Sequence, residues 1–357
     1  MEWERGLIIV PATRRGSLLE SSFGTCALGA RMFCERPTGA YRLRACSLFG
    51  CGTAALGSSS LGQCRSRHAV MQILLVVILL NYNVSAEDKA PAIDDVTYGA
   101  PQQIATLANQ KINESSGLAV SRVERGLFWT HNDSGDKPRI FAFDVAGKDR
   151  GEYRIPKATA NDWEDMASVI VEGKPYLVLA DVGDNARRRE FCALYVVKEP
   201  TGTKQSIKPR KIRFRYQDGP HDCESIAIDP VSKRIFLMTK ALAIRCPIYQ
   251  LAWPDDDSDD VLVAQRVGSV QLPIVTAMDI AADGRRAIMV TYVNAYEFQR
   301  RGEETWPDAF ARSPRLIEMP QRRQGETICY GQDSRTLYLT SERTPTPLWR
   351  VAPRVAR

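Results

Sequence analysis

The chain has 357 residues and a formal net charge of +6, from 48 Lys and Arg against 42 Asp and Glu. Nearly all of this charge lies in residues 1–70, which carry nine Arg, no Lys and four Glu. The rest of the chain is close to neutral, which excludes the basic surface that nucleic-acid binding requires. The length allows either two average domains or one large all-β domain with extensions.

Residues 1–70 are rich in Arg, Cys, Gly and Ser and show no hydrophobic period that would bury one face. We interpret them as a disordered extension, or as an upstream segment that follows from a misassigned start codon. Residues 71–86 have the pattern of a secretory signal peptide, an apolar run of about eight to ten residues before Val84-Ser85-Ala86. A buried internal strand is the alternative.

The same apolar run is too short for a membrane span, which needs roughly 20 apolar residues. The sequence therefore predicts that residues 87–357 form a single exported domain, secreted or periplasmic, with no membrane span in the mature protein. Four cysteines lie in this domain, without the C-x-x-C spacing of a zinc or redox site. They are compatible with two disulfides, Cys223 to Cys246 being the first pair to test, or with buried free thiols.

Short apolar runs alternate with turn signals from about residue 94 onward, and no amphipathic helix is visible. The first strand of each repeat is expected near residues 116, 165, 225, 279 and 327. A repeat of roughly 47 to 60 residues with three or four strands predicts an all-β fold, a β-propeller. We expect five blades, or six if the long second repeat holds two. A strand within residues 96–106 would close the ring by completing the last blade.

Acidic residues gather at one end of the predicted strands. Glu164, Glu224 and Glu326 occupy the same position in three repeats, at the start of the first strand. Glu114 is expected two residues before this position and Asp279 one residue after it. Because the first strands of a propeller line its central channel, these side chains should face one another. Glutamate is also a poor turn former, so turn formation alone does not explain the pattern.

The second strands end in further polar residues, among them Lys240. Carboxylates that converge on one opening repel each other unless a cation is present. Calcium accepts about six to eight oxygen ligands from carboxylates, amides and carbonyl groups. We therefore predict a calcium ion in an acidic central funnel. The expected ligands are Glu114, Asp133, Glu164, Asp184, Glu224, Asp279 and Glu326.

The predicted domain has two histidines, His131 and His221, and both are next to acidic residues in the sequence. A histidine beside carboxylates can act as a general base near neutral pH. We therefore predict catalytic roles for His131, His221 and Lys240. The alternative is that both histidines only cap strand ends through hydrogen bonds. Two histidines cannot form a three-histidine zinc site, so we do not expect a catalytic zinc.

Several strings carry a resemblance to known proteins: Glu114-Ser115-Ser116-Gly117, Trp129-Thr130-His131-Asn132-Asp133, Asp162-Trp163-Glu164-Asp165 and Asp181-Val182-Gly183-Asp184-Asn185. Together they resemble a group of secreted bacterial β-propeller proteins, loosely related to phytase-like, esterase-like and lactonase-type propellers. The resemblance spans roughly residues 112–352. It implies an extracytoplasmic propeller that holds calcium in its central channel.

The leading hypothesis is a metal-dependent hydrolase of an ester, a lactone or a phosphoester, in which the cation polarises the substrate oxygen. One alternative is a glycosidase with paired carboxylates, and another is a non-catalytic propeller that binds a protein, a small molecule or a carbohydrate. A histidine within reach of the glutamates would favour hydrolysis, whereas two histidines directed elsewhere would favour binding. We expect a monomer that binds no nucleic acid.

Overall fold

The computed structural model describes residues 96–202, 205–241, 245–254 and 259–354. All the described residues belong to one compact unit, residues 89–357, which is the second of two units in the chain. The expected extension (1–70) and signal peptide (71–86) lie outside the described residues, so both stay predictions. The following account concerns the second unit. No helix in its described part has the length and apolar character that crossing a membrane would require.

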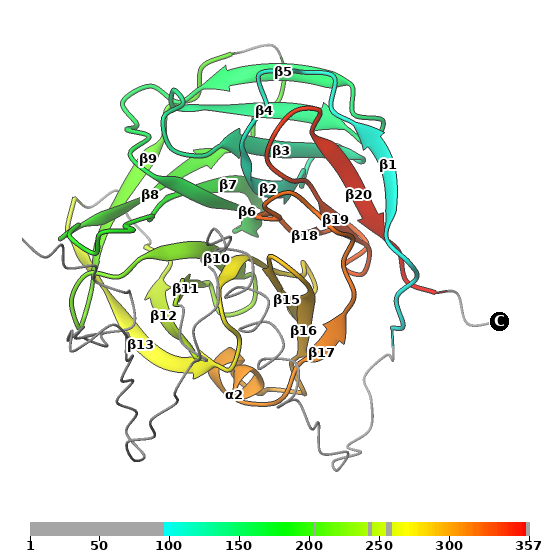
Figure 1. The fold of residues 1–357 in the computed structure, drawn as a ribbon. Helices are drawn as coiled ribbons and strands as arrows, with labels where there is room; N and C mark the ends of the chain where they lie inside the picture. The colour runs from blue at the N-terminus through cyan, green and yellow to red at the C-terminus, as the bar shows by residue number, and fades with distance from the viewer. Residues whose placement is uncertain (1–95, 203–204, 242–244, 255–258, 355–357) are drawn as a thin grey trace, which may run out of the picture. The chain divides into compact units, whose positions relative to one another are not determined.

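Most strands of this unit pair with the strand that follows them in the sequence, and β1, which pairs with β20, is an exception (Figure 1). One four-stranded sheet has the order β2 (Ser115–Val120), β3 (Leu127–Asn132), β4 (Arg139–Asp144) and β5 (Asp149–Arg154). Another consists of β14 (Val275–Ile280), β15 (Arg286–Thr291), β16 (Ala295–Gln299) and β17 (Arg315–Ile317). A third has the order β1 (Gln102–Thr106), β20 (Pro347–Val351), β19 (Leu337–Leu339) and β18 (Cys329–Tyr330).

The remaining sheet has eight strands and contains two meanders. The first meander is β6 (Trp163–Val171), β7 (Lys174–Asp181), β8 (Cys192–Lys198) and β9 (Arg210–Tyr216). The second is β10 (Cys223–Asp229), β11 (Arg234–Thr239), β12 (Cys246–Ala252) and β13 (Leu262–Val270). The outermost strands, β9 and β13, pair in parallel, and this short ladder alone joins the meanders into one sheet.

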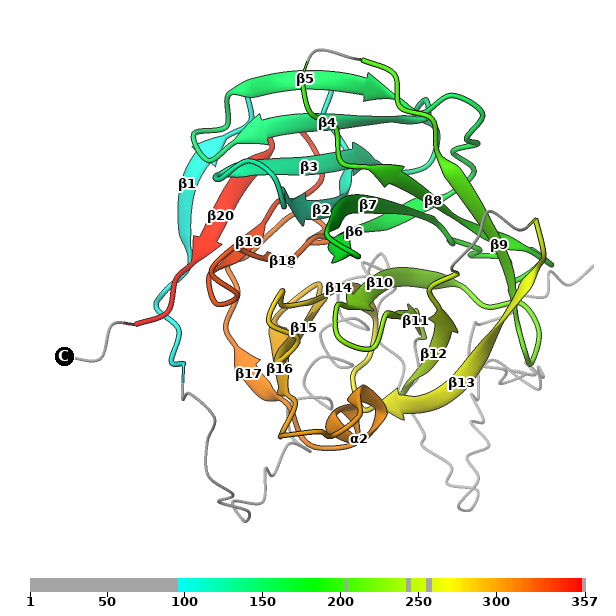
Figure 2. The same ribbon diagram turned by 180° about the vertical axis from the view of Figure 1, so that it is seen from behind.

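The N-terminal and C-terminal strands of this unit lie side by side (Figures 1 and 2). β1 pairs antiparallel with β20, so the earliest described strand is the fourth of the sheet that ends the chain. The innermost strands contact one another in a cycle: β2 with β6, β6 with β10, β10 with β14, β14 with β18, and β18 with β2. The all-β, propeller-like part of the prediction is therefore confirmed.

Apolar side chains fill the space between neighbouring sheets. Strands β2, β10 and β14 are buried along their whole length, as expected for strands covered on both faces. Between the meanders of the eight-stranded sheet, Val178, Phe214, Ile226, Leu237 and Tyr249 belong to one buried cluster. Burying each such side chain stabilises the fold by about 1.5–3 kcal/mol. The ends of these strands are held at fixed positions by this packing.

Two expectations need correction. A short helix, α2 (Trp306–Phe310), is present where no helix was predicted; Thr305 caps it by accepting a hydrogen bond from the Asp308 amide. Five residues are too few to show a helical period in the sequence. The four cysteines of the described part are free and buried, so the predicted disulfide option is not present in the structure. Cys246 Sγ donates instead to the Leu272 carbonyl at 3.0 Å.

Candidate functional site: an acidic cluster at the strand ends

A β-bulge recurs near the start of four inner strands. In β2, β6, β10 and β14 the register slips by one residue against the strand that follows each of them, which is β3, β7, β11 or β15. The extra residues are Ser116, Glu164, Glu224 and Thr276. A bulge leaves its extra residue outside the ladder and redirects the side chain. The bulges therefore place Glu164 and Glu224 at equivalent positions, as the sequence alignment predicted.

The bulges also correct the alignment of Asp279. Thr276 occupies the equivalent position in β14, and Asp279 lies three residues further along the strand. Its carboxylate accepts a hydrogen bond from the Tyr330 amide at 2.8 Å. The comparison of the repeats in the sequence was wrong here, because Thr276 and Ser116 occupy the bulge position as well as glutamate does. Their hydroxyls donate to backbone carbonyls of the next inner segment, Gly325 and Glu164.

Five carboxylates form two overlapping groups. The first contains Asp133, Asp162 and Glu164, and the second contains Asp133, Glu326 and Glu342; in each group the carboxylate oxygens lie within 4.8 Å of one another. Asp133 belongs to both groups and therefore connects them. We call these five residues the acidic cluster. Every donor is a carboxylate oxygen, which suits a hard cation such as calcium and does not suit zinc.

Backbone contacts hold Asp133 in the cluster. It follows β3, and its amide donates to the Glu114 carbonyl at 2.9 Å. Glu114 in turn forms an antiparallel bridge with Glu342, which follows β19. The ends of β3 and β19 are therefore aligned through the segment that precedes β2. Glu114 contributes to the site through this backbone contact, and its own carboxylate is not in the acidic cluster.

A close approach by Gly183 shapes the other side of the acidic cluster. A Cβ at this position would lie 2.3 Å from Glu164 Oε1 and 2.5 Å from Asp162 Cγ. Glycine therefore preserves the positions of these two carboxylates, because any side chain here would displace them. Gly183 follows β7 and its amide donates to the Asp162 carbonyl at 3.2 Å.

Burial and mutual repulsion raise the pKa values in the acidic cluster. Burial, together with the charges of Glu224 and Asp133, raises the pKa of Glu164 to about 11. Burial and contact with Glu326 raise the pKa of Glu342 to about 9. Burial raises the pKa of Asp133 to about 6, and Glu326 adds to this shift. The cluster therefore retains protons at neutral pH unless a cation replaces them.

A cationic side chain lies on one flank of the acidic cluster. Lys240 Nζ forms an ion pair with Glu224 Oε1 and lies 5.8 Å from the centre of the Tyr292 ring. The Tyr292 hydroxyl donates to Glu326 Oε1 at 3.1 Å. Burial raises the pKa of Glu224 to about 8 although Lys240 opposes the shift. Glu224 is therefore committed to Lys240, and the metal-compatible groups do not include it.

The structure brings together three of the seven expected ligands: Asp133, Glu164 and Glu326. Asp184 lies elsewhere, with its carboxylate accepting from the Arg189 amide at 2.7 Å. Two cluster members, Asp162 and Glu342, were not among the expected ligands. Their signal was present in the sequence, because Asp162 directly precedes an inner strand and Glu342 follows a second strand. Tyr292 was also missed, since it lies just after β15 and carries no charge.

The histidines lie outside the acidic cluster. His131 is fully buried, Nδ1 bonds the Asn132 carbonyl at 2.9 Å, and the ring packs edge-on against Trp163. Burial lowers the pKa of His131. His221 is partly exposed, and its Nε2 lies 3.0 Å from Asp218 Oδ1 and 2.7 Å from the Tyr249 hydroxyl. Both rings are therefore engaged by other groups.

No protein-family model and no curated protein sequence matches this chain. Similar solved structures include a gluconolactonase from Xanthomonas campestris, with 13% identity, coverage of 67% of this chain and 72% of that chain, and a TM-score of 0.41. A nidogen/laminin complex shows 14% identity, coverage of 64% and 73%, and a TM-score of 0.38.

The β-propeller domain of Cps50 (Swd1) from Myceliophteria thermophila shows 12% identity, coverage of 66% of this chain and 83% of that chain, and a TM-score of 0.35. TM-scores this low support no functional argument. Functional inference therefore rests on the side chains of the acidic cluster.

Proposed function

We propose that this protein is an exported five-bladed β-propeller that binds calcium in the acidic cluster and, through the cation, an oxygen-rich small molecule or carbohydrate. The cycle of inner strands supports the blade number, and the β1–β20 pair supports closure of the last blade by the N-terminal strand. The observation that carries the function is the pair of carboxylate groups that share Asp133.

Each member of the acidic cluster would offer an oxygen ligand to the cation. Asp133 would be the common ligand, Asp162 and Glu164 would bind from one side, and Glu326 and Glu342 from the other. Bound calcium would supply positive charge and coordination positions for hydroxyl or carboxylate oxygens of a ligand. Gly183 has no Cβ that would displace the carboxylates of Asp162 and Glu164, which supports a binding role for this side of the acidic cluster.

The positions of the histidines favour binding over hydrolysis. His131 is enclosed in the core, and His221 bonds Asp218 and Tyr249. Neither ring lies among the carboxylates of the two groups. A general base must come within hydrogen-bond reach of the proton that it removes. The two predicted histidine bases do not meet this requirement at the acidic cluster.

Hydrolysis of an ester or a lactone is the second candidate, favoured by one observation. Asp133, with a pKa raised to about 6, could accept a proton from water near neutral pH. Glu164, with a pKa raised to about 11, would stay protonated and could donate one. A glycosidase that uses two carboxylates of one group is less favoured, because within each group these oxygens lie within 4.8 Å, closer than the roughly 5–9.5 Å that glycosidase carboxyl groups need.

The test is calcium titration of the full chain, followed by calorimetry and by thermal unfolding with calcium and with a chelator. We expect saturable binding and a higher melting temperature, since a ligand at about 100 times its Kd adds roughly 2.7 kcal/mol of stability. Asp133→Asn should remove both effects because Asp133 belongs to both groups.

Asp184→Asn is the matched control, an identical change at a buried carboxylate outside the acidic cluster, and it should retain calcium binding. Absence of calcium binding to the unmodified protein, or unchanged binding by Asp133→Asn, would contradict the proposal. Hydrolysis of ester or lactone substrates that is lost in Asp133→Asn would support the second candidate.

A further inference from the structure

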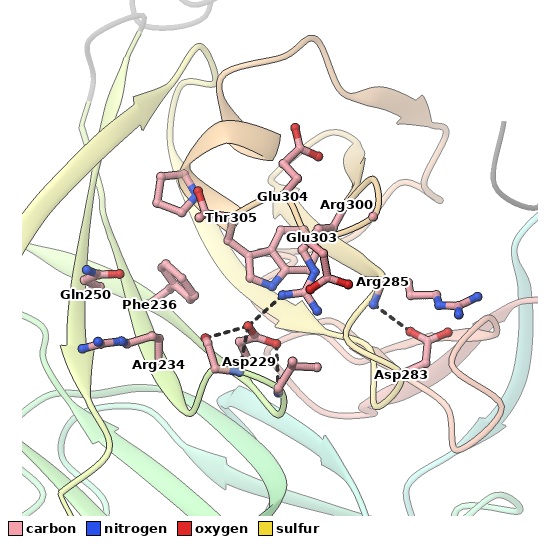
Figure 3. A pocket seen from close by; sticks show the side chains of 15 residues that line it. Asp229, Arg234, Phe236, Gln250, Asp283, Arg285, Arg300, Glu303, Glu304 and Thr305 are labelled. Carbon is pink, nitrogen blue, oxygen red and sulfur yellow. Dashed lines mark hydrogen bonds and ion pairs between the residues drawn. The ribbon is translucent and has the colours of Figure 1, made fainter. Parts of the chain in front are cut away.

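A cavity of about 830 Å³ lies at the other end of β10 from Glu224 (Figure 3). Asp229, which lines the cavity, is five residues from Glu224 on the same strand, roughly 16 Å away at about 3.3 Å per residue. The cavity is bounded by the β10–β11 turn, the β14–β15 turn and the segment 300–307. Ligand pockets commonly have volumes of about 300–1,000 Å³, so the space suits a small molecule.

The acidic side chains of this cavity largely have partners. Asp229 Oδ2 accepts from Arg300 at 2.9 Å and from the Ser232 hydroxyl at 2.6 Å. Glu304 forms an ion pair with Arg312. The carboxylate of Asp283 accepts a hydrogen bond from the backbone amide of Arg285, and this bond does not involve the Arg285 guanidinium.

Two arginines of the cavity are not neutralised. Among the described residues, Arg234 and Arg285 form no ion pair, and both are exposed. Figure 3 shows Arg234 beside Gln250 and Phe236 on one side, with Arg285 near Asp283 on the other. Glu303 is the one lining acid without a partner in the described part of the chain. The unpaired charge of the cavity is therefore positive overall.

The cavity also offers apolar surface and a spare donor. Val231, in the β10–β11 turn, is 66% exposed, an unusual exposure for a large apolar side chain within a cavity. Phe236 and Trp306 are buried beneath it. Trp306 Nε1 has no hydrogen-bond partner among the described residues. A buried donor left without an acceptor costs about 1–3 kcal/mol, but Nε1 has almost no exposed surface, so a ligand oxygen would reach it only after a shift of this wall.

We propose that this cavity is a second binding site that takes a small organic anion with a flat apolar body, such as an aromatic carboxylate or sulfonate. The anionic group would bind one of the two unpaired arginines, Arg234 or Arg285, which lie on opposite sides of the cavity, and the apolar body would cover Val231. The Arg300 guanidinium donates a hydrogen bond to Asp229 and packs over the Trp306 ring, and it thereby fixes these two lining residues of the cavity. This site selects an anion, whereas the acidic cluster selects a cation, so binding here does not depend on calcium.

The test uses the full chain with the fluorescent anion 1-anilinonaphthalene-8-sulfonate and its neutral analogue N-phenyl-1-naphthylamine. We expect saturable binding of the anion at one site, and binding of the neutral analogue weaker by about ten-fold, because charge-assisted hydrogen bonds are lost. The double substitution Arg234→Gln with Arg285→Gln should weaken anion binding by about ten-fold or more without lowering the melting temperature.

Arg125→Gln is the matched control, because Arg125 is an exposed arginine of the β2–β3 turn and does not line the cavity. It should bind the anion as the unmodified protein does, and so should Asp133→Asn. Failure of the anion to saturate, equal binding of the neutral analogue, or wild-type binding by the double variant would each overturn the proposal.

Discussion

Two neighbouring acidic residues of β6 have opposite surroundings. Asp165 is fully buried, and its carboxylate accepts from the amides of Met166 at 2.8 Å, Ile226 at 2.9 Å and Met278 at 3.4 Å. Glu164, one residue earlier, faces other carboxylates and has no such set of donors. The first side chain joins three inner strands, whereas the second is left available for a ligand.

This contrast shows that backbone register, and not residue type, decides which carboxylates are available. The bulge at Glu164 turns this side chain toward the end of the strand, and the next residue then points into the space between β6, β10 and β14. Asp279 repeats the second arrangement by accepting from Tyr330 on β18. Acidic residues of the inner strands thus form a structural class, which accepts from backbone amides, and a strand-end class, which faces other carboxylates.

The largest expected effect separates these classes by stability. Asp165→Ala leaves buried amides of β10 and β14 without an acceptor, at about 1–3 kcal/mol for each donor. We expect a loss of roughly 3–5 kcal/mol in the free energy of unfolding, measured by urea denaturation in the presence of a chelator.

The matched variant Glu164→Gln should keep its stability under the same conditions, since a pKa raised to about 11 keeps Glu164 protonated and glutamine resembles the neutral carboxyl group. Equal losses in the two variants would show that Asp165 and Glu164 do not differ in role.

The pH dependence of stability tests the acidic cluster as a whole. The pKa values of Asp133 and Glu342 are raised to about 6 and about 9, so the folded chain binds more protons than the unfolded chain above pH ~4. Stability is then greatest at low pH and falls as pH rises through these folded-state values. In chelator, we expect the melting temperature to decrease between pH 4 and 9.

Calcium should flatten or reverse this slope, because the cation stabilises the charged carboxylates. Glu342→Gln should reduce the slope in chelator, mainly at its alkaline end. A melting temperature that rises across the whole window in chelator would mean that the cluster is not repulsive.

The sequence was sufficient for the strand pattern and for the end of the strands where the acids gather. Hydrophobic runs bounded by turn residues identify strands locally, and the recurrence of the run with Glu164, Glu224 and Glu326 identifies equivalent positions. The bulges were not predictable, since a one-residue slip depends on the partner strand. That slip is why Asp279 was predicted to be a calcium ligand, although Thr276 occupies the position equivalent to Glu164 and Glu224.

The membership of the acidic cluster also depended on partners far away in the chain. Glu224 has the correct position but is neutralised by Lys240, and Asp184 is bound to the Arg189 amide. The histidines are adjacent to acidic residues in the sequence, yet strand alternation directs His131 into the core against Trp163. Residues that are adjacent in the sequence can therefore be assigned to the same end of a strand, but their adjacency does not predict which side chains contact one another there.

The smallest expected effect concerns the boundary between the acidic cluster and its cationic flank. Lys240→Met removes the partner of Glu224 and a positive charge that opposes cation binding near Glu326. We expect calcium affinity to increase by about five- to ten-fold, a gain near 1–1.4 kcal/mol, measured by calorimetry at pH 8. Methionine retains the length of the side chain, so the packing against Tyr292 is preserved.

Lys233→Met is the control for Lys240→Met, because its ion pair with Glu172 is exposed and Glu172 follows the end of β6, whereas Glu164 lies at the start of that strand. It should leave calcium affinity unchanged, since exposed pairs are largely screened by solvent. If Lys240→Met lowered the affinity instead, Lys240 would be needed to hold Glu224 and Tyr292 in place around the cation. The flank would then be part of the binding site and not its boundary.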